Sequence, residues 1–126
     1  MEINEMTQCI KSVLETDLNN LGFSKKYFLG EGGRYEWHFR KIDQDIRFME
    51  MEKRYVKITF TLLHVIRPLD LDMTELLPES SFMDELYGFE CKDIHEFEKL
   101  LLKIRPIILD KGIQWLDTNY AKYRVK

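Results

Sequence analysis

The sequence has few of the features that mark several large classes of protein. Its 126 residues include two cysteines and no apolar run near the ~20 residues that cross a bilayer. Cys9 and Cys91 lie far apart and outside any C-x-x-C pair, so we expect free thiols in a reducing compartment. The net charge of −3 argues against a polybasic nucleic-acid binder. The first residues are acidic rather than basic and then apolar, so we expect no signal peptide and a cytoplasmic location.

Motifs of catalysis and metal binding are also missing or incomplete. The glycines at 30–33 precede a predicted strand rather than a helix, which favours a turn over a phosphate loop. His95 begins an H-E-x-x-H pattern, but Lys99 stands where the second histidine is required. Residues 70–81 lack the glycine and the final glutamate of a calcium loop. We therefore expect no catalytic residue, no cofactor and no metal, and we favour a non-enzymatic role.

The residues that are present suit one α+β domain covering residues 1–126. Hydrophobic residues make up 44% of the chain and aromatic residues 13%, enough for a sizeable core. Apolar side chains recur at steps of three and four over residues 3–21, which predicts an amphipathic helix. Gly22 follows directly and suits the left-handed residue that ends a helix.

Residues 34–66 change from helical periodicity to strict alternation. Trp37 and Phe39 alternate with polar residues in a first strand, and two further alternating runs follow. The connectors are short and polar, so we expect an antiparallel meander of three strands, or four if residues 27–29 form another. Segregated strands and helices indicate the α+β class, with the terminal helices packed on one face of the sheet.

The remainder of the chain divides into an irregular segment and a helical one. Residues 67–92 contain Pro68 and Pro78, and we interpret them as a long surface excursion with short helical turns at 73–77 and 82–87. Residues 93–124 return to helical periodicity behind a capping box at Asp93 and Glu96. Pro106 either kinks this helix or begins a second one.

Charge is distributed unevenly, and this asymmetry carries the leading functional hypothesis. Residues 68–98 contain ten acidic side chains against the single basic side chain of Lys92. Such a segment can steer a basic partner by matching its electrostatic potential. We therefore predict a bacterial immunity-type or inhibitor-type protein that docks a basic protein partner. The predicted partner-binding residues are Asp70, Asp72, Glu75, Glu79, Asp84 and Glu85.

Two alternatives stay open at this point. The polar residues Glu36, His38 and Arg40 alternate with the apolar residues of the first strand, which predicts an exposed polar stripe on the open face of the sheet. That stripe could serve a small-ligand binder or an enzyme. The third hypothesis is a homo-oligomeric scaffold, such as a homodimer, which requires an exposed apolar patch.

Three segments carry a resemblance to a known family. Leu21-Gly22-Phe23-Ser24-Lys25-Lys26 is similar to an L-G-F-K-K opening before an aromatic-rich strand, and the alternating run from 35 to 66 and the late step Ile113-Gln114-Trp115-Leu116 also match. On these segments the chain resembles the small bacterial domains of the uncharacterised family numbered 4304. That family has no established activity, so the resemblance implies a fold and no catalytic residue. The composition is also similar to that of immunity proteins of bacterial toxin systems.

Overall fold

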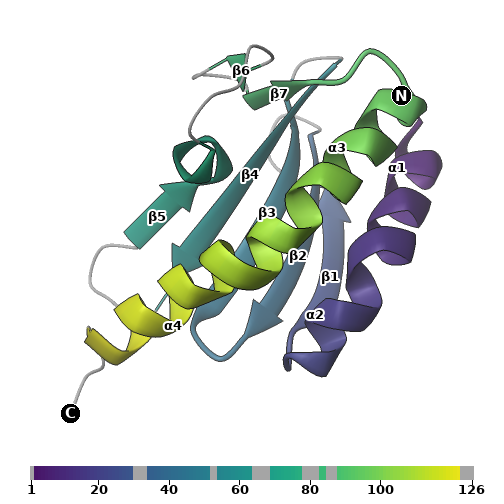
Figure 1. Cartoon of the computed structure of the whole chain (residues 1–126). Coiled ribbons are helices and arrows are strands. Elements are labelled where there is room, and N and C mark those ends of the chain that lie inside the picture. Colours follow the sequence, from purple (N-terminus) through teal and green to yellow (C-terminus); the bar gives the residue numbers. More distant parts are fainter. Residues whose placement is uncertain are drawn as a thin grey trace.

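The computed structural model describes residues 2–29, 34–51, 54–63, 69–77, 83–84 and 88–122. It has an α+β architecture, as the sequence predicts (Figure 1). The elements in chain order are α1 (Ile3–Ile10), a π-helical segment (Lys11–Glu15), α2 (Thr16–Asn20), β1 (Ser24–Leu29), β2 (Tyr35–Lys41), β3 (Gln44–Met51), β4 (Tyr55–Leu62), β5 (Leu69–Asp72), a 3-10 turn (Met73–Leu76), β6 (Met83–Asp84), β7 (Gly88–Glu90), α3 (Ile94–Ile107), a second π-helical segment (Ile108–Gly112) and α4 (Ile113–Lys122).

The first four strands form the predicted antiparallel meander. β1 pairs with β2, β2 with β3 and β3 with β4, so each strand lies beside its neighbour in sequence. The additional strand that the sequence left open near residues 27–29 is present, and it begins earlier, at Ser24. β2 and β3 are joined by a two-residue turn in which Asp43 adopts φ 60°, a conformation that aspartate tolerates better than most residues.

The described residues of the segment 67–92 do not form the surface excursion that we predicted. β5 pairs with one half of β4 and β7 pairs with the other half, while β6 pairs with β7. The described residues therefore form a seven-stranded sheet, more than the three or four strands expected. The physical reason is that β4 would otherwise be a long edge with unpaired backbone groups. The predicted turn at 73–77 is confirmed, whereas residues 83–84 are a strand rather than part of a helix.

The two terminal helices are nearly continuous. The first runs from Ile3 to Asn20 and ends as predicted at Gly22, whose φ is 94°, with the Phe23 amide donating to the Leu18 carbonyl. The second runs from Ile94 to Lys122 and passes through Pro106, which lies inside α3 and does not begin a new helix. A π-helical segment follows this proline, and such segments commonly accompany local disturbance of the helical hydrogen bonds.

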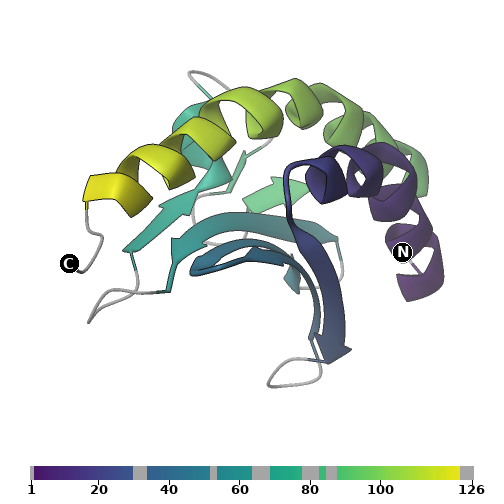
Figure 2. The same cartoon turned by 90° about the horizontal axis from the view of Figure 1, so that it is seen from below.

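Both helices lie on one face of the sheet, where the core is located (Figures 1 and 2). The C-terminal helix crosses the sheet diagonally, and the N-terminal helix runs beside it near β1. The fully buried aromatic side chains of Trp37, Phe39, Phe48 and Phe60 fill the space between sheet and helices. The Trp37 indole donates to the Thr7 hydroxyl at 2.9 Å, which fixes the first helix against β2. Gly112 lets the second helix approach Phe60 so closely that an added Cβ would lie 2.5 Å from the ring.

Some sequence-based expectations fall outside the part of the chain that the structure describes. They are the turn at 30–33, His64, and the predicted partner-binding residues Glu79 and Glu85. Asp84 lies in β6, but its side chain is not described. Among the described helices, none is long and apolar enough for a bilayer crossing.

Candidate functional site

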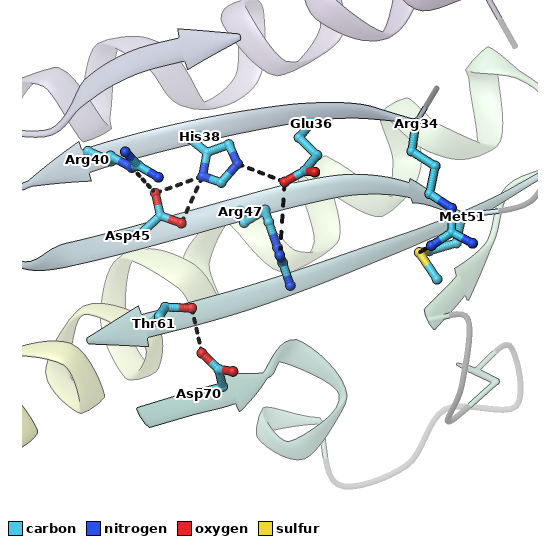
Figure 3. Close-up of polar contacts among 9 residues, drawn as sticks. All are labelled: Arg34, Glu36, His38, Arg40, Asp45, Arg47, Met51, Thr61 and Asp70. Carbon is cyan, nitrogen blue, oxygen red and sulfur yellow. Dashed lines mark hydrogen bonds and ion pairs between the residues drawn. The ribbon is translucent and has the colours of Figure 1, made fainter. Parts of the chain in front are cut away.

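The open face of the sheet carries a cluster of polar side chains from β2 and β3. Trp37 and Phe39 of β2 point to the helices, so the residues that alternate with them point the other way. Strand pairing places His38 opposite Arg47 and Arg40 opposite Asp45. Figure 3 shows these side chains gathered across the two strands. We call Glu36, His38, Arg40, Asp45 and Arg47 the open-face cluster.

A buried imidazole between two carboxylates is the centre of this cluster. His38 Nδ1 lies 2.8 Å and 2.9 Å from the two carboxylate oxygens of Asp45, and Nε2 lies 3.0 Å from Glu36 Oε1 (Figure 3). Both ring nitrogens of His38 are therefore engaged within the protein, and a general acid or base needs one of them to face a substrate.

Two arginines are anchored to the same carboxylates. Arg40 Nε donates to Asp45 Oδ1 at 3.1 Å, and Arg47 Nη1 lies 3.9 Å from Glu36 Oε1. The carboxylate side chains are only 5% and 15% exposed, whereas the arginine side chains are 39% and 31% exposed. The anions thus lie beneath the guanidinium groups and hold them at the surface. Such an arrangement suits an oxyanion, because guanidinium groups bind carboxylate and phosphate through paired hydrogen bonds.

Unused hydrogen-bonding capacity lies beside the cluster. Thr59 of β4 is opposite Arg47, which continues the row that begins at His38. Arg47 Nε and Thr59 Oγ1 are both buried and have no hydrogen-bond partner among the described residues. Buried polar atoms almost always have a hydrogen-bond partner, so two neighbouring exceptions on one face require an explanation.

The structure brings together all three residues predicted for this face but corrects their exposure. Glu36, His38 and Arg40 share one face, as the alternation predicts. His38, however, is buried at 4% exposure, so the stripe is not the exposed one that we expected. The reason is the pairing with Asp45, which covers the imidazole from the next strand. Asp45 and Arg47 were not predicted, although the short 41–44 connector implies the register that places Asp45 opposite Arg40.

Several described acidic residues of the 68–98 segment have local structural contacts. Asp70 accepts a hydrogen bond from the Thr61 hydroxyl at 2.8 Å and is exposed. Asp72 and Glu75 form a capping box on the 3-10 turn, and Asp72 also lies 3.6 Å from the Lys57 ammonium. Part of the acidic composition is therefore explained by capping and sheet contacts rather than by a partner.

Neither cysteine is activated as a nucleophile. Burial, followed by the negative charges of Glu96, Asp93 and Glu90, raises the pKa of the Cys91 thiol to about 12. Burial also raises the pKa of Cys9. Both side chains are thus held as thiols, and the thiolate is the reactive form. Within the described residues, no group of three or more histidine, cysteine or acidic side chains is arranged to hold a metal ion.

The chain matches no protein-family model, no curated protein and no solved structure. The resemblance to the family numbered 4304 therefore stays a prediction.

Proposed function

We propose that this protein is a non-enzymatic binding protein that recognises a small anion, a carboxylate or phosphate group, on the open face of the sheet. One observation carries the proposal. Arg40 donates to the more deeply buried Asp45 and Arg47 lies 3.9 Å from the more deeply buried Glu36, and both arginines keep about a third of the side chain exposed. An arginine that is already fixed loses less conformational freedom when it binds a ligand.

The energetics of the cluster support binding rather than stability as its role. A buried ion pair must offset the loss of hydration of both charges, and apolar replacements are often as stable. His38 and Asp45 are among the few buried polar residues of the described chain, and they lie together. A sheet face that needed only to be covered could use apolar or exposed polar side chains instead.

The experiment is a titration of the full chain with inorganic phosphate and with citrate, followed by calorimetry and by amide chemical shifts. We expect saturable binding and shifts confined to β2, β3 and β4. Arg47→Gln should weaken binding by about tenfold, the range of one lost charge-assisted contact. Arg105→Gln is the matched control, because Arg105 also pairs with a carboxylate, that of Asp17, but lies on the helices. Equal weakening by both variants, or shifts spread over the whole surface, would contradict the proposal.

Docking of a basic protein partner through the acidic segment is the second candidate. Asp70 and Glu75 are exposed, as docking requires. A sharp test keeps the capping box intact and reverses the charges of Asp70 and Glu79 to lysine, with Glu2 and Glu5 as the control pair. We expect the first pair to weaken binding of a lysine-rich peptide and to flatten its salt dependence more than the control pair does. Equal effects of both pairs would remove this candidate.

A further inference from the structure

A second candidate site lies on the helix side of the sheet, away from the open-face cluster. A cavity of about 510 Å³ is bounded by β7, by the first half of α3 and by the residue after the 3-10 turn, a region in the upper half of Figure 1. Its apolar lining comes from Leu77, Phe89, Leu100 and Ile104. A volume of this size falls in the range of small-molecule pockets, which are mostly apolar with a few polar groups.

The lysines and the glutamates at this cavity differ in their polar contacts. Lys92, Lys99 and Lys103 line it, and within the part of the chain that the structure describes their ammonium groups form no ion pair. The two carboxylates at the cavity are already engaged. Glu96 accepts from the Lys92 backbone amide at 3.3 Å, and Glu90 lies 3.7 Å from Arg54 Nε.

The order of residues along α3 places charge beside the apolar lining. Lys99 and Lys103 are four residues apart, and each directly precedes an apolar lining residue, Leu100 and Ile104. Residues four apart lie on one side of a helix, so the two ammonium groups flank the same cavity. A lysine stem can cover apolar surface while its ammonium stays in water at the rim.

We propose that this cavity binds an anionic amphiphile, a single carboxylate on an apolar chain or ring. The apolar lining contacts the apolar part of the ligand, and the ammonium groups of Lys99 and Lys103 bind its carboxylate at the rim. Charge favours this class, because the lining carries three lysines against two glutamates, and one of these, Glu90, already lies 3.7 Å from Arg54. The site is independent of the proposed anion site on the open face, whose ligand needs no apolar part.

The test uses decanoate, below its micellar concentration, as the probe on the full chain. We expect saturable binding by calorimetry, with amide shifts at Phe89 and along residues 92–104. The double variant Lys99→Gln/Lys103→Gln should bind decanoate about tenfold more weakly, from two lost exposed charge contacts. Lys111→Gln, on the same helix outside the cavity, should bind as the parent does. Decyltrimethylammonium, with the same chain and the opposite charge, should not bind at this site.

A second variant separates cavity binding from a general change of charge. Leu100→Trp adds volume to the lining without altering charge, so it should weaken decanoate and leave phosphate binding on the open face unchanged. Arg47→Gln should do the reverse. Equal binding of decanoate and decyltrimethylammonium would overturn the proposal, as would full affinity in the double lysine variant or no saturable binding by the parent. Circular dichroism of each variant confirms that the comparison is made on folded protein.

Discussion

Side chains are buried on both faces of β2, but by opposite means. Along β2, Trp37 and Phe39 are buried beneath the helices, and His38 between them is buried on the face that the helices do not cover. The first face is closed by apolar side chains from other elements. The second is closed by its own ion pairs, with Asp45 and Glu36 on either side of the imidazole.

This difference separates the face that stabilises the fold from the face that is available to a ligand. Apolar burial contributes about 25 cal/mol per Å², so the helix-covered face provides most of the stabilisation. A buried ionic cluster contributes little net free energy, yet breaking it leaves uncompensated charge. We therefore expect the helix-covered face to respond to lost volume, and the open face to respond to lost charge partners.

The largest expected effect comes from removing volume on the helix-covered face. Phe60 is fully buried and packs against the second helix at Gly112. Phe60→Ala should lower the free energy of unfolding by about 3–5 kcal/mol, since it leaves a cavity in the core. Urea unfolding followed by circular dichroism measures this loss. Ile42→Ala, at the exposed turn between β2 and β3, is the control and should change stability by less than about 0.5 kcal/mol.

Removing one carboxylate tests the open face. Asp45 accepts hydrogen bonds from both His38 and Arg40, so Asp45→Asn removes one of the two carboxylates that flank the buried imidazole. We expect a loss of about 3 kcal/mol in the same urea experiment. Asp70→Asn is the matched control, because the exposed Asp70 accepts only from the Thr61 hydroxyl among the contacts described. If the two variants lost equal stability, the buried His38 would not depend on the Asp45 carboxylate.

A smaller effect is expected at the cap of the 3-10 turn. The Asp72 carboxylate accepts from the Thr74 backbone amide at 3.0 Å and from the Thr74 hydroxyl at 2.9 Å. Asp72→Ala should cost about 1 kcal/mol, the usual effect of a lost N-cap. Asp72→Asn retains an acceptor and should recover most of that loss. Equal losses in both variants would indicate that the ion pair with Lys57 matters more than the cap.

Most of the α+β fold could be predicted because its signals are local. Periodic apolar residues predict the first helix, and strict alternation with short connectors predicts the meander. The strands at 69–72 and 88–90 were missed because each is short, and β7 pairs with the start of β4 across more than thirty positions. The alternation of Leu69 and Leu71 with Asp70 and Asp72 was the available signal, and the acidic composition concealed it.

The open-face cluster could be predicted only in part for a related reason. Alternation places Glu36, His38 and Arg40 on one face, which required no knowledge of the neighbouring strand. Burial of His38 depends on Asp45, and that pairing depends on the register between two strands. The cavity beside α3 is lined by residues more than twenty positions apart in sequence, such as Leu77 and Ile104, so no local sequence pattern predicts it.

The smallest expected effect concerns a carboxylate on the other face of β3. Glu50 alternates with Asp45 and Arg47, so it points to the helix side, where burial raises the pKa of its carboxyl group. A raised pKa favours the protonated form in the folded chain, so this stability is present below the unfolded pKa of about 4.3 and is lost as the pH rises through the folded value. Glu50→Gln cannot ionise. It should therefore match the parent near pH 3 and be slightly more stable at pH 7, by less than the loss at Asp45. Unfolding by urea at both pH values measures the change. A difference in stability that does not depend on pH would show that burial does not disfavour the ionised form of Glu50.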